Sequence, residues 1–103
     1  MTLEDARRVI TTAEKKANEI GQPMNIAVAD DGGSMVAHVR MDAKHSQSGS
    51  QFFGIHASNS EKILIFAGGV PLKRDGKVVG AIGVSGGSGD QDHSVATAGA
   101  AAF

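Results

Sequence analysis

The fold of this chain is decided by the stretch Phe66-Ala67-Gly68-Gly69-Val70-Pro71-Leu72 together with Asp75-Gly76-Lys77-Val78-Val79-Gly80-Ala81-Ile82-Gly83-Val84-Ser85-Gly86-Gly87. It predicts a strand, a tight turn and a second strand, followed by a glycine loop that leads into a helix. Glycine at so many positions indicates backbone that turns with positive φ or is approached closely by another chain or a ligand. The strand 77–85 is apolar or small on both faces, which is typical of a central strand covered on both sides.

Working outward, residues 3–20 have helical periodicity. Apolar residues recur at helical spacing, namely Leu3, Ala6, Val9, Ile10, Ala13, Ala17 and Ile20. Thr2 and Asp5 resemble a capping box, with Asp in place of the usual Glu or Gln. Gly21 and Pro23 are typical of a helix end. At the other end, residues 90–103 predict an alanine-rich helix with acidic residues in its first turn.

Four more strands are expected between these elements, at Met24–Ala29, Ser34–Met41, Phe53–Ser58 and Ile63–Ala67. Asp30-Asp31-Gly32-Gly33 predicts a hairpin turn, as does Arg74-Asp75-Gly76. Residues 42–51 are polar without periodicity and predict a loop. On the second strand, alternation places Met35, Ala37, Val39 and Met41 on one face and Val36, His38 and Arg40 on the other.

The expected order is therefore α-β-β-loop-β-β-β-α. This is an α/β (α+β) chain in which one antiparallel five-stranded sheet carries an N-terminal and a C-terminal helix. A length of 103 residues suits a single domain, 1–103.

Composition excludes several classes of function. The net charge of −1 gives no electrostatic footprint for nucleic acid or an anionic membrane. The absence of cysteine removes disulfides, thiolate metal sites and a cysteine nucleophile. The acidic N-terminus does not resemble a signal peptide, and no apolar run approaches a membrane span. We therefore expect a cytoplasmic protein without nucleic-acid or membrane partners.

A group of motifs in a fixed order resembles the family that includes GlcG of glycolate operons, the haem-binding protein HbpS and the C-terminal domain of PduO, with the GlcG branch most similar. The motifs span nearly the whole chain: Leu3-Glu4-Asp5-Ala6, Val28-Ala29-Asp30-Asp31-Gly32-Gly33, Arg40-Met41-Asp42, Gly68-Gly69-Val70-Pro71-Leu72, Gly80-Ala81-Ile82-Gly83-Val84-Ser85-Gly86 and Gln91-Asp92. The resemblance implies a profilin-like fold, homo-oligomers and, for some members, haem binding, haem degradation or corrinoid reduction.

The chain departs from this family after Arg40-Met41-Asp42, where members normally have a segment holding two helices. Here Ala43-Lys44-His45 passes almost directly into Ser46-Gln47-Ser48-Gly49. Either the chain is shorter at this point, or the printed sequence omits residues. Without the segment, one sheet face lacks helical cover, and an apolar face of that size should drive association.

Candidate cofactor-binding residues are His38, Arg40 and His56. Imidazole binds haem iron and many metals. Arg40 shares a strand face with His38 and could pair with a haem propionate or a small carboxylate. The alternative is an ordinary solvated strand face. His45 falls in the shortened loop.

The glycine-rich loops form a second candidate site, a ligand-binding loop of Gly68, Gly69, Val70, Pro71, Gly86 and Gly87. Backbone N–H groups before a helix can bind anions, although Asp90 and Asp92 would repel phosphate. The alternative is a tight connection that permits close helix–strand packing. Asp90 and His93 share a helix face at i, i+3 spacing, which would allow metal ligation or be simply a solvated helix start.

Two functions of different classes follow. The first, implied by the resemblance, is a haem- or tetrapyrrole-binding accessory protein, with redox or haem-degrading activity as one form of it. The second is a non-catalytic oligomeric scaffold or small-carboxylate-binding module linked to glycolate- or propanediol-type metabolism, because no catalytic constellation stands out.

Overall fold

The computed structural model describes residues 1–42, 55–59, 62–65 and 69–103, and in 55–59 and 62–65 it describes the backbone alone. Within these ranges the elements are α1 (Leu3–Glu19), β1 (Asn25–Asp30), β2 (Met35–Arg40), β3 (Ile55–Asn59), β4 (Lys62–Ile65), β5 (Gly69–Arg74), β6 (Lys77–Ser85) and α2 (Gly89–Ala100). The α+β class, with helices at both ends of the element order, is confirmed. The predicted loop 42–51, including His45, lies outside the described residues except for Asp42.

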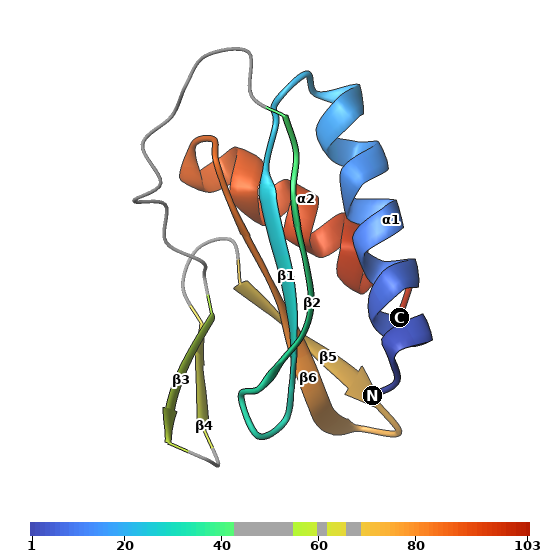
Figure 1. The fold of residues 1–103 in the computed structure, drawn as a ribbon, viewed down its shortest axis with the longest axis vertical. Helices are drawn as coiled ribbons and strands as arrows, with labels where there is room; N and C mark the ends of the chain where they lie inside the picture. Colours follow the sequence, from blue (N-terminus) through green and yellow to red (C-terminus); the bar gives the residue numbers. More distant parts are fainter. Residues whose placement is uncertain (43–54, 60–61, 66–68) are drawn as a thin grey trace.

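The strands form two sheets rather than one. A four-stranded antiparallel sheet has the order β2-β1-β6-β5, and β3 pairs with β4 in a separate two-stranded sheet. The prediction of one five-stranded sheet is therefore wrong. In Figure 1, α1 lies on one side of the main sheet and the β3–β4 hairpin on the other. β3 approaches β6 and β4 approaches β5.

The additional strand is β5, where the prediction had a ligand-binding loop that included Gly69, Val70 and Pro71. Gly69 pairs with Gly83, Val70 with Ile82 and Pro71 with Ala81. Glycine and proline weaken a strand, and proline cannot donate to the ladder, so both are tolerated best at a sheet edge. β5 is such an edge. Its pairing with β6 overrides the loop signal of the glycine and the proline.

β6 lies between β1 and β5, and its residues from Gly80 to Ser85 are all buried. The prediction of a central strand covered on both faces is confirmed. The hairpin between β5 and β6 turns at Asp75 and Gly76, which have φ of 54° and 78°. Positive φ at both central residues is the geometry of a type I′ turn, which matches the twist of the flanking strands.

A bulge in β2 corrects the predicted face of Met35. Ala37 pairs with Val28 but Met35 pairs with Ala29, so β2 has one residue more than β1 at this point. An extra residue reverses the alternation of side chains beyond it. Met35 is consequently 58% exposed, while Val36, Ala37, Val39 and Met41 pack against the core.

The core lies between one face of the main sheet and the two helices. The periodicity of α1 is confirmed, because its apolar stripe Ala6, Val9, Ile10, Ala13 and Ala17 is buried. Thr2 forms the predicted capping box, and its hydroxyl accepts a hydrogen bond from the Asp5 N–H at 3.0 Å. The sheet contributes Ile26 and Val28 from β1, Leu72 from β5, and Ile82 and Val84 from β6.

The two helices pack closely because α2 has glycine where it meets α1. A Cβ atom on Gly99 would lie 3.1 Å from the Ala13 Cβ and 2.6 Å from the Ile82 Cδ1. α2 ends at Ala100, three residues before the predicted end, and its N-cap is Ser88. Close contact with α1 and β6 thus positions the helix that follows the glycine loop.

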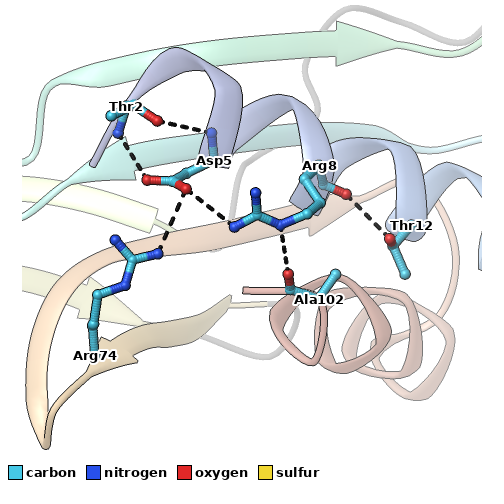
Figure 2. A network of polar contacts seen from close by, with 6 residues as sticks. All are labelled: Thr2, Asp5, Arg8, Thr12, Arg74 and Ala102. Carbon is cyan, nitrogen blue, oxygen red and sulfur yellow. Dashed lines mark hydrogen bonds and ion pairs between the residues drawn. The ribbon is translucent and has the colours of Figure 1, made fainter.

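Asp5 joins the first turn of α1 to the β5–β6 hairpin. Its carboxylate pairs with Arg8 at 3.1 Å and Arg74 at 3.5 Å (Figure 2). Arg8 Nε also donates to the Ala102 carbonyl at 2.9 Å. These contacts hold both ends of the described chain against the same edge of the sheet.

No helix in the described ranges is long and apolar enough to cross a membrane.

Candidate functional site

The face of the main sheet that points away from the helices has a floor of short side chains. Because residues alternate along a strand, the neighbours of the core residues Ile26, Val28, Ile82 and Val84 point to this face. We call the six residues that form it the small-residue floor: Ala27, Ala29, Gly69, Pro71, Ala81 and Gly83. Ala27, Ala29 and Ala81 are only 3%, 5% and 0% exposed. The floor is therefore covered in this structure, and apart from the Pro71 ring it offers only backbone and Cβ atoms to what lies over it.

His38 stands at one edge of this floor. It pairs with Ala27, which pairs with Gly83, which in turn pairs with Gly69. One row across the sheet therefore begins with the His38 imidazole and continues with Ala27, Gly83 and Gly69, none of which has a side-chain atom beyond Cβ. His38 itself is exposed, at the outer strand of the sheet.

The next row across the same face is polar. Arg40 pairs with Asn25, and Asn25 pairs with Ser85. We call Arg40, Asn25 and Ser85 the polar row. Arg40 is exposed, Asn25 is half-buried and Ser85 is 7% exposed. The structure therefore places the predicted residues His38 and Arg40 side by side along one face, at the end of the small-residue floor.

Ser85 is the residue that sequence reasoning missed. Its Oγ is buried and has no hydrogen-bond partner among the described residues. A buried hydroxyl normally finds a partner, so an exception needs an explanation. The only signal in the sequence was a hydroxyl at the end of an otherwise apolar or small strand.

His56, the third predicted cofactor residue, lies in β3 and pairs with Leu64 of β4. The hairpin that carries it approaches the main sheet at β5 and β6. The side chain of His56 is not among those described, so its role stays a prediction.

The glycine loop before α2 has its polar groups engaged by the first turn of α2 and by Gln22. The Gly87 N–H donates to Asp92 Oδ1 at 2.8 Å, and the Ser88 N–H donates to Gln91 Oε1 at 2.9 Å. The Gly86 carbonyl accepts from Gln22 Nε2 at 2.9 Å. This geometry favours the interpretation of Gly86 and Gly87 as a tight connection over that of an anion-binding loop.

Burial raises the pKa of Asp92 above its ordinary value, and the hydrogen bond from the Gly87 N–H acts in the opposite direction. The carboxylate thus occupies the position where an anion would have to sit. An external anion at this helix start would meet Asp92 before it met the backbone.

The remaining residues of the predicted ligand-binding loop, Gly68, Gly69, Val70 and Pro71, do not form a loop site among the described residues. Gly68 lies outside the described residues, and Gly69, Val70 and Pro71 belong to β5 rather than to a loop. Their backbone groups on one side pair with β6. Gly69 and Pro71 therefore contribute to the small-residue floor and not to a phosphate-type cradle.

The predicted metal pair Asp90 and His93 lies on the first turns of α2, and both residues are exposed. Within the described ranges, no group of three or more His, Cys, Asp or Glu side chains is arranged to hold a metal ion. Asp90 and His93 alone supply two ligands, whereas structural sites usually have four.

Comparison with known proteins assigns the chain to a family. A family model described as haem degrading protein HbpS-like matches residues 1–50 and 43–101. The chain belongs to the HbpS-like family. The resemblance found in the motifs is therefore confirmed.

Several relatives align with most of this chain. An uncharacterized 15.0 kDa protein encoded in the dhaT–dhaS intergenic region of Citrobacter freundii is 32% identical, over 93% of this chain and 87% of its own length. The crystal structure of ORFY from Klebsiella pneumoniae is 29% identical with a TM-score of 0.78, over 100% of this chain and 90% of that one. A double mutant of HbpS from Streptomyces reticuli is 28% identical with a TM-score of 0.79, over 100% and 86%.

These comparisons also bear on the shortened loop after Asp42. The alignment to the Citrobacter freundii protein spans 123 positions, more than the 103 residues of this chain. Some residues of the relative must therefore have no counterpart in this chain. The family model likewise matches in two sections, 1–50 and 43–101, which overlap at residues 43–50. Both observations agree with a family segment that is missing from this sequence, as the motifs indicated.

Proposed function

We propose that this protein binds haem or a related tetrapyrrole as an accessory protein. The observation that carries the proposal is the row His38–Ala27–Gly83–Gly69 across the helix-free sheet face. A flat ring needs a flat surface, and residues without long side chains would provide one once the cover that buries Ala27 and Gly83 in this structure is displaced. An imidazole at the edge of that surface is a group that binds haem iron.

The residues present fit such a ligand. Ligand sites are mostly apolar concave surfaces with a few polar groups that fix orientation. Here the small-residue floor supplies the apolar part, and His38 and Arg40 supply imidazole and guanidinium groups at its end. When bound, haem would supply the redox chemistry, and the chain would hold and orient the ring.

The comparisons add support from relatives. The matching family is described as haem degrading. A complex of the PduO C-terminal domain with haem has the same fold, with a TM-score of 0.76 at 21% identity over all of this chain and 94% of that one. The same proposal includes, as a further step, that the chain degrades the bound haem or reduces a bound corrinoid.

The test is a titration of the purified protein with haemin, followed by the Soret absorbance. A saturable change at a fixed ratio to subunits, lost in His38→Ala or His56→Ala, would support the proposal and identify the ligand residue. His93→Ala is the matched control, because His93 is exposed on α2, away from this sheet face. A non-saturating rise that is the same in all four proteins would rule the proposal out.

A second function, a small-carboxylate-binding or scaffold module without catalysis, is favoured by one specific observation. The polar row combines one cation with an amide and a hydroxyl, which suits a carboxylate whether or not a ring is attached. Binding of glycolate measured by calorimetry, in a protein that does not take up haemin, would favour this alternative. Sedimentation of the unliganded protein would test the homo-oligomer that both functions assume.

A further inference from the structure

We infer that the polar row Arg40–Asn25–Ser85 binds a carboxylate group of the ligand, with the Ser85 hydroxyl as a direct hydrogen-bond donor. In its haem form the inference rests on the proposed function, because the carboxylate is then a propionate of the ring. In its other form the carboxylate belongs to a free small acid. The chemistry recognised is the same in both cases.

The first step of the argument is the position of Ser85. The preceding residue, Val84, is 1% exposed and lies in the core, so the Ser85 side chain leaves the sheet on the helix-free face. It adjoins the small-residue floor, because Ser85 follows Gly83 on that face of β6. The hydroxyl therefore lies on the same covered face of the sheet as the floor.

The second step is that this hydroxyl lacks a partner. Ser85 is 7% exposed, and its Oγ makes no hydrogen bond to any described residue. Leaving a buried hydroxyl unpaired costs free energy that an alanine at the same place would not cost. A ligand acceptor would satisfy the hydroxyl, which explains why a polar residue stands there.

The third step is the row in which Ser85 stands. Opposed Cα atoms in an antiparallel pair are about 5 Å apart, so the Arg40 guanidinium and the Ser85 hydroxyl can both reach an acceptor placed above Asn25. Within the described part of the chain, neither Arg40 nor Asn25 takes part in a side-chain hydrogen bond or ion pair with another described residue. Their donors are thus available to a ligand.

The fourth step is the charge of the row. It contains one cation and no acidic residue, and its two other members are neutral donors. A single cation with neutral donors matches the single charge of a carboxylate, and charge-assisted hydrogen bonds of this type are the strong ones. A metal cation would be repelled by Arg40. The row therefore selects an anionic group at one end of an apolar floor.

The experiment compares two ligands and two variants. Haemin and haemin dimethyl ester differ only in the two methyl groups that esterify the propionates, so the ester cannot offer a carboxylate. The variants are Ser85→Ala and Arg40→Gln. Their matched controls are Ser34→Ala and Arg7→Gln, because both positions are exposed and neither side chain makes a hydrogen bond or ion pair among the described residues. Thermal unfolding of each apo-protein checks that it folds.

We expect Ser85→Ala to weaken haemin binding about tenfold, the size typical of one hydrogen bond to a charged group. Arg40→Gln should weaken it at least as much. The ester should bind the wild-type protein more weakly than haemin does, and it should not distinguish Ser85→Ala from wild type. Controls should bind both ligands like the wild type.

The outcomes separate this inference from the proposed function. Tight haemin binding that is unchanged in Ser85→Ala, or weakened equally for haemin and its ester, overturns the inference and leaves haem binding standing. If haemin does not bind, haem binding fails and glycolate becomes the deciding ligand. Glycolate binding that is lost in Ser85→Ala supports a carboxylate site for a free acid, whereas no glycolate binding overturns the inference as well.

Discussion

The carboxylate of Asp5 lies 3.5 Å from the guanidinium of Arg74 and thereby joins the first turn of α1 to the β5–β6 hairpin (Figure 2). Asp5 also accepts a hydrogen bond from the Thr2 N–H at 3.1 Å and pairs with Arg8. The guanidinium of Arg74 in turn lies 4.3 Å above the centre of the Phe103 ring. One acidic side chain thus orders the start of α1, a hairpin and the end of the described chain.

The pKa of Asp5 lies well below its usual range, chiefly because its carboxylate accepts a hydrogen bond from the Thr2 N–H. Contacts of the carboxylate with the side chains of Thr2, Arg8 and Arg74 lower this pKa further. A carboxyl whose pKa falls on folding stabilises the protein above its unfolded pKa, about 4. That stabilisation is lost as the pH falls through the lower folded pKa. Asp5→Asn should therefore lower the unfolding temperature at pH 7, and the difference from wild type should shrink below about pH 4.

Unfolding temperatures of the two proteins between pH 2 and pH 8 check this prediction, and the control is Asp31→Asn in the exposed turn after β1. A difference between wild type and Asp5→Asn that is constant across the pH range would contradict a role for the Asp5 charge.

The contact of α2 with α1 makes Gly99 sensitive to enlargement. A side chain there would collide with Ala13 and with Ile82, both buried. Overpacking of this kind costs about 1–3 kcal/mol, so Gly99→Val should lower the free energy of unfolding by about 2 kcal/mol. Urea denaturation measures the change. Thr97→Val places the same side chain at an exposed position of the same helix and should cost less than about 0.5 kcal/mol.

The β5–β6 turn depends on the backbone freedom of Gly76. A Cβ at this position would meet nothing within 4 Å, so a substitution tests the φ of 78° alone. Gly76→Ala should lower the free energy of unfolding by about 1 kcal/mol because a side chain is strained at this φ. Gly32→Ala, at an exposed turn glycine without positive φ, is the matched control. Equal effects of the two substitutions in chemical denaturation would refute this account.

Ser85 should limit the stability of the unliganded protein. Since its buried Oγ has no partner among the described residues, Ser85→Ala should raise the free energy of unfolding by about 1 kcal/mol. Thermal unfolding of the apo-protein, with Ser34→Ala as control, measures this change. A stability gain together with loss of ligand binding is the signature of a residue kept for function; a stability loss would mean that the hydroxyl is satisfied within the protein.

The sequence predicted the elements whose signals are local. The apolar stripe and capping box of α1, the Asp75-Gly76 turn and the fully buried β6 all follow from residues close together in the chain. The motifs also identified the family. These predictions succeeded because helix periodicity, caps and turn residues act over a few positions and need no distant partner.

Other features depended on contacts between distant segments. Gly69 and Pro71 form an edge strand only because β6 offers them a ladder, and Met35 turns outward only because of the bulge opposite Ala29. Likewise, the side chains of Asp92 and Gln91 accept hydrogen bonds from backbone N–H groups of the loop before α2. The glycine pattern of the sequence does not show these contacts.

For the candidate site, the sequence by itself determined that His38 and Arg40 share a strand face, because alternation along a strand has a period of two. Only the tertiary structure decided that this face adjoins a floor of alanine and glycine, and that Ser85 lies two strands away from Arg40 with a buried, unpartnered hydroxyl. Strand order and register are set by long-range pairing of backbone and by burial of the opposite face against the helices, and neither is encoded in any short stretch of residues.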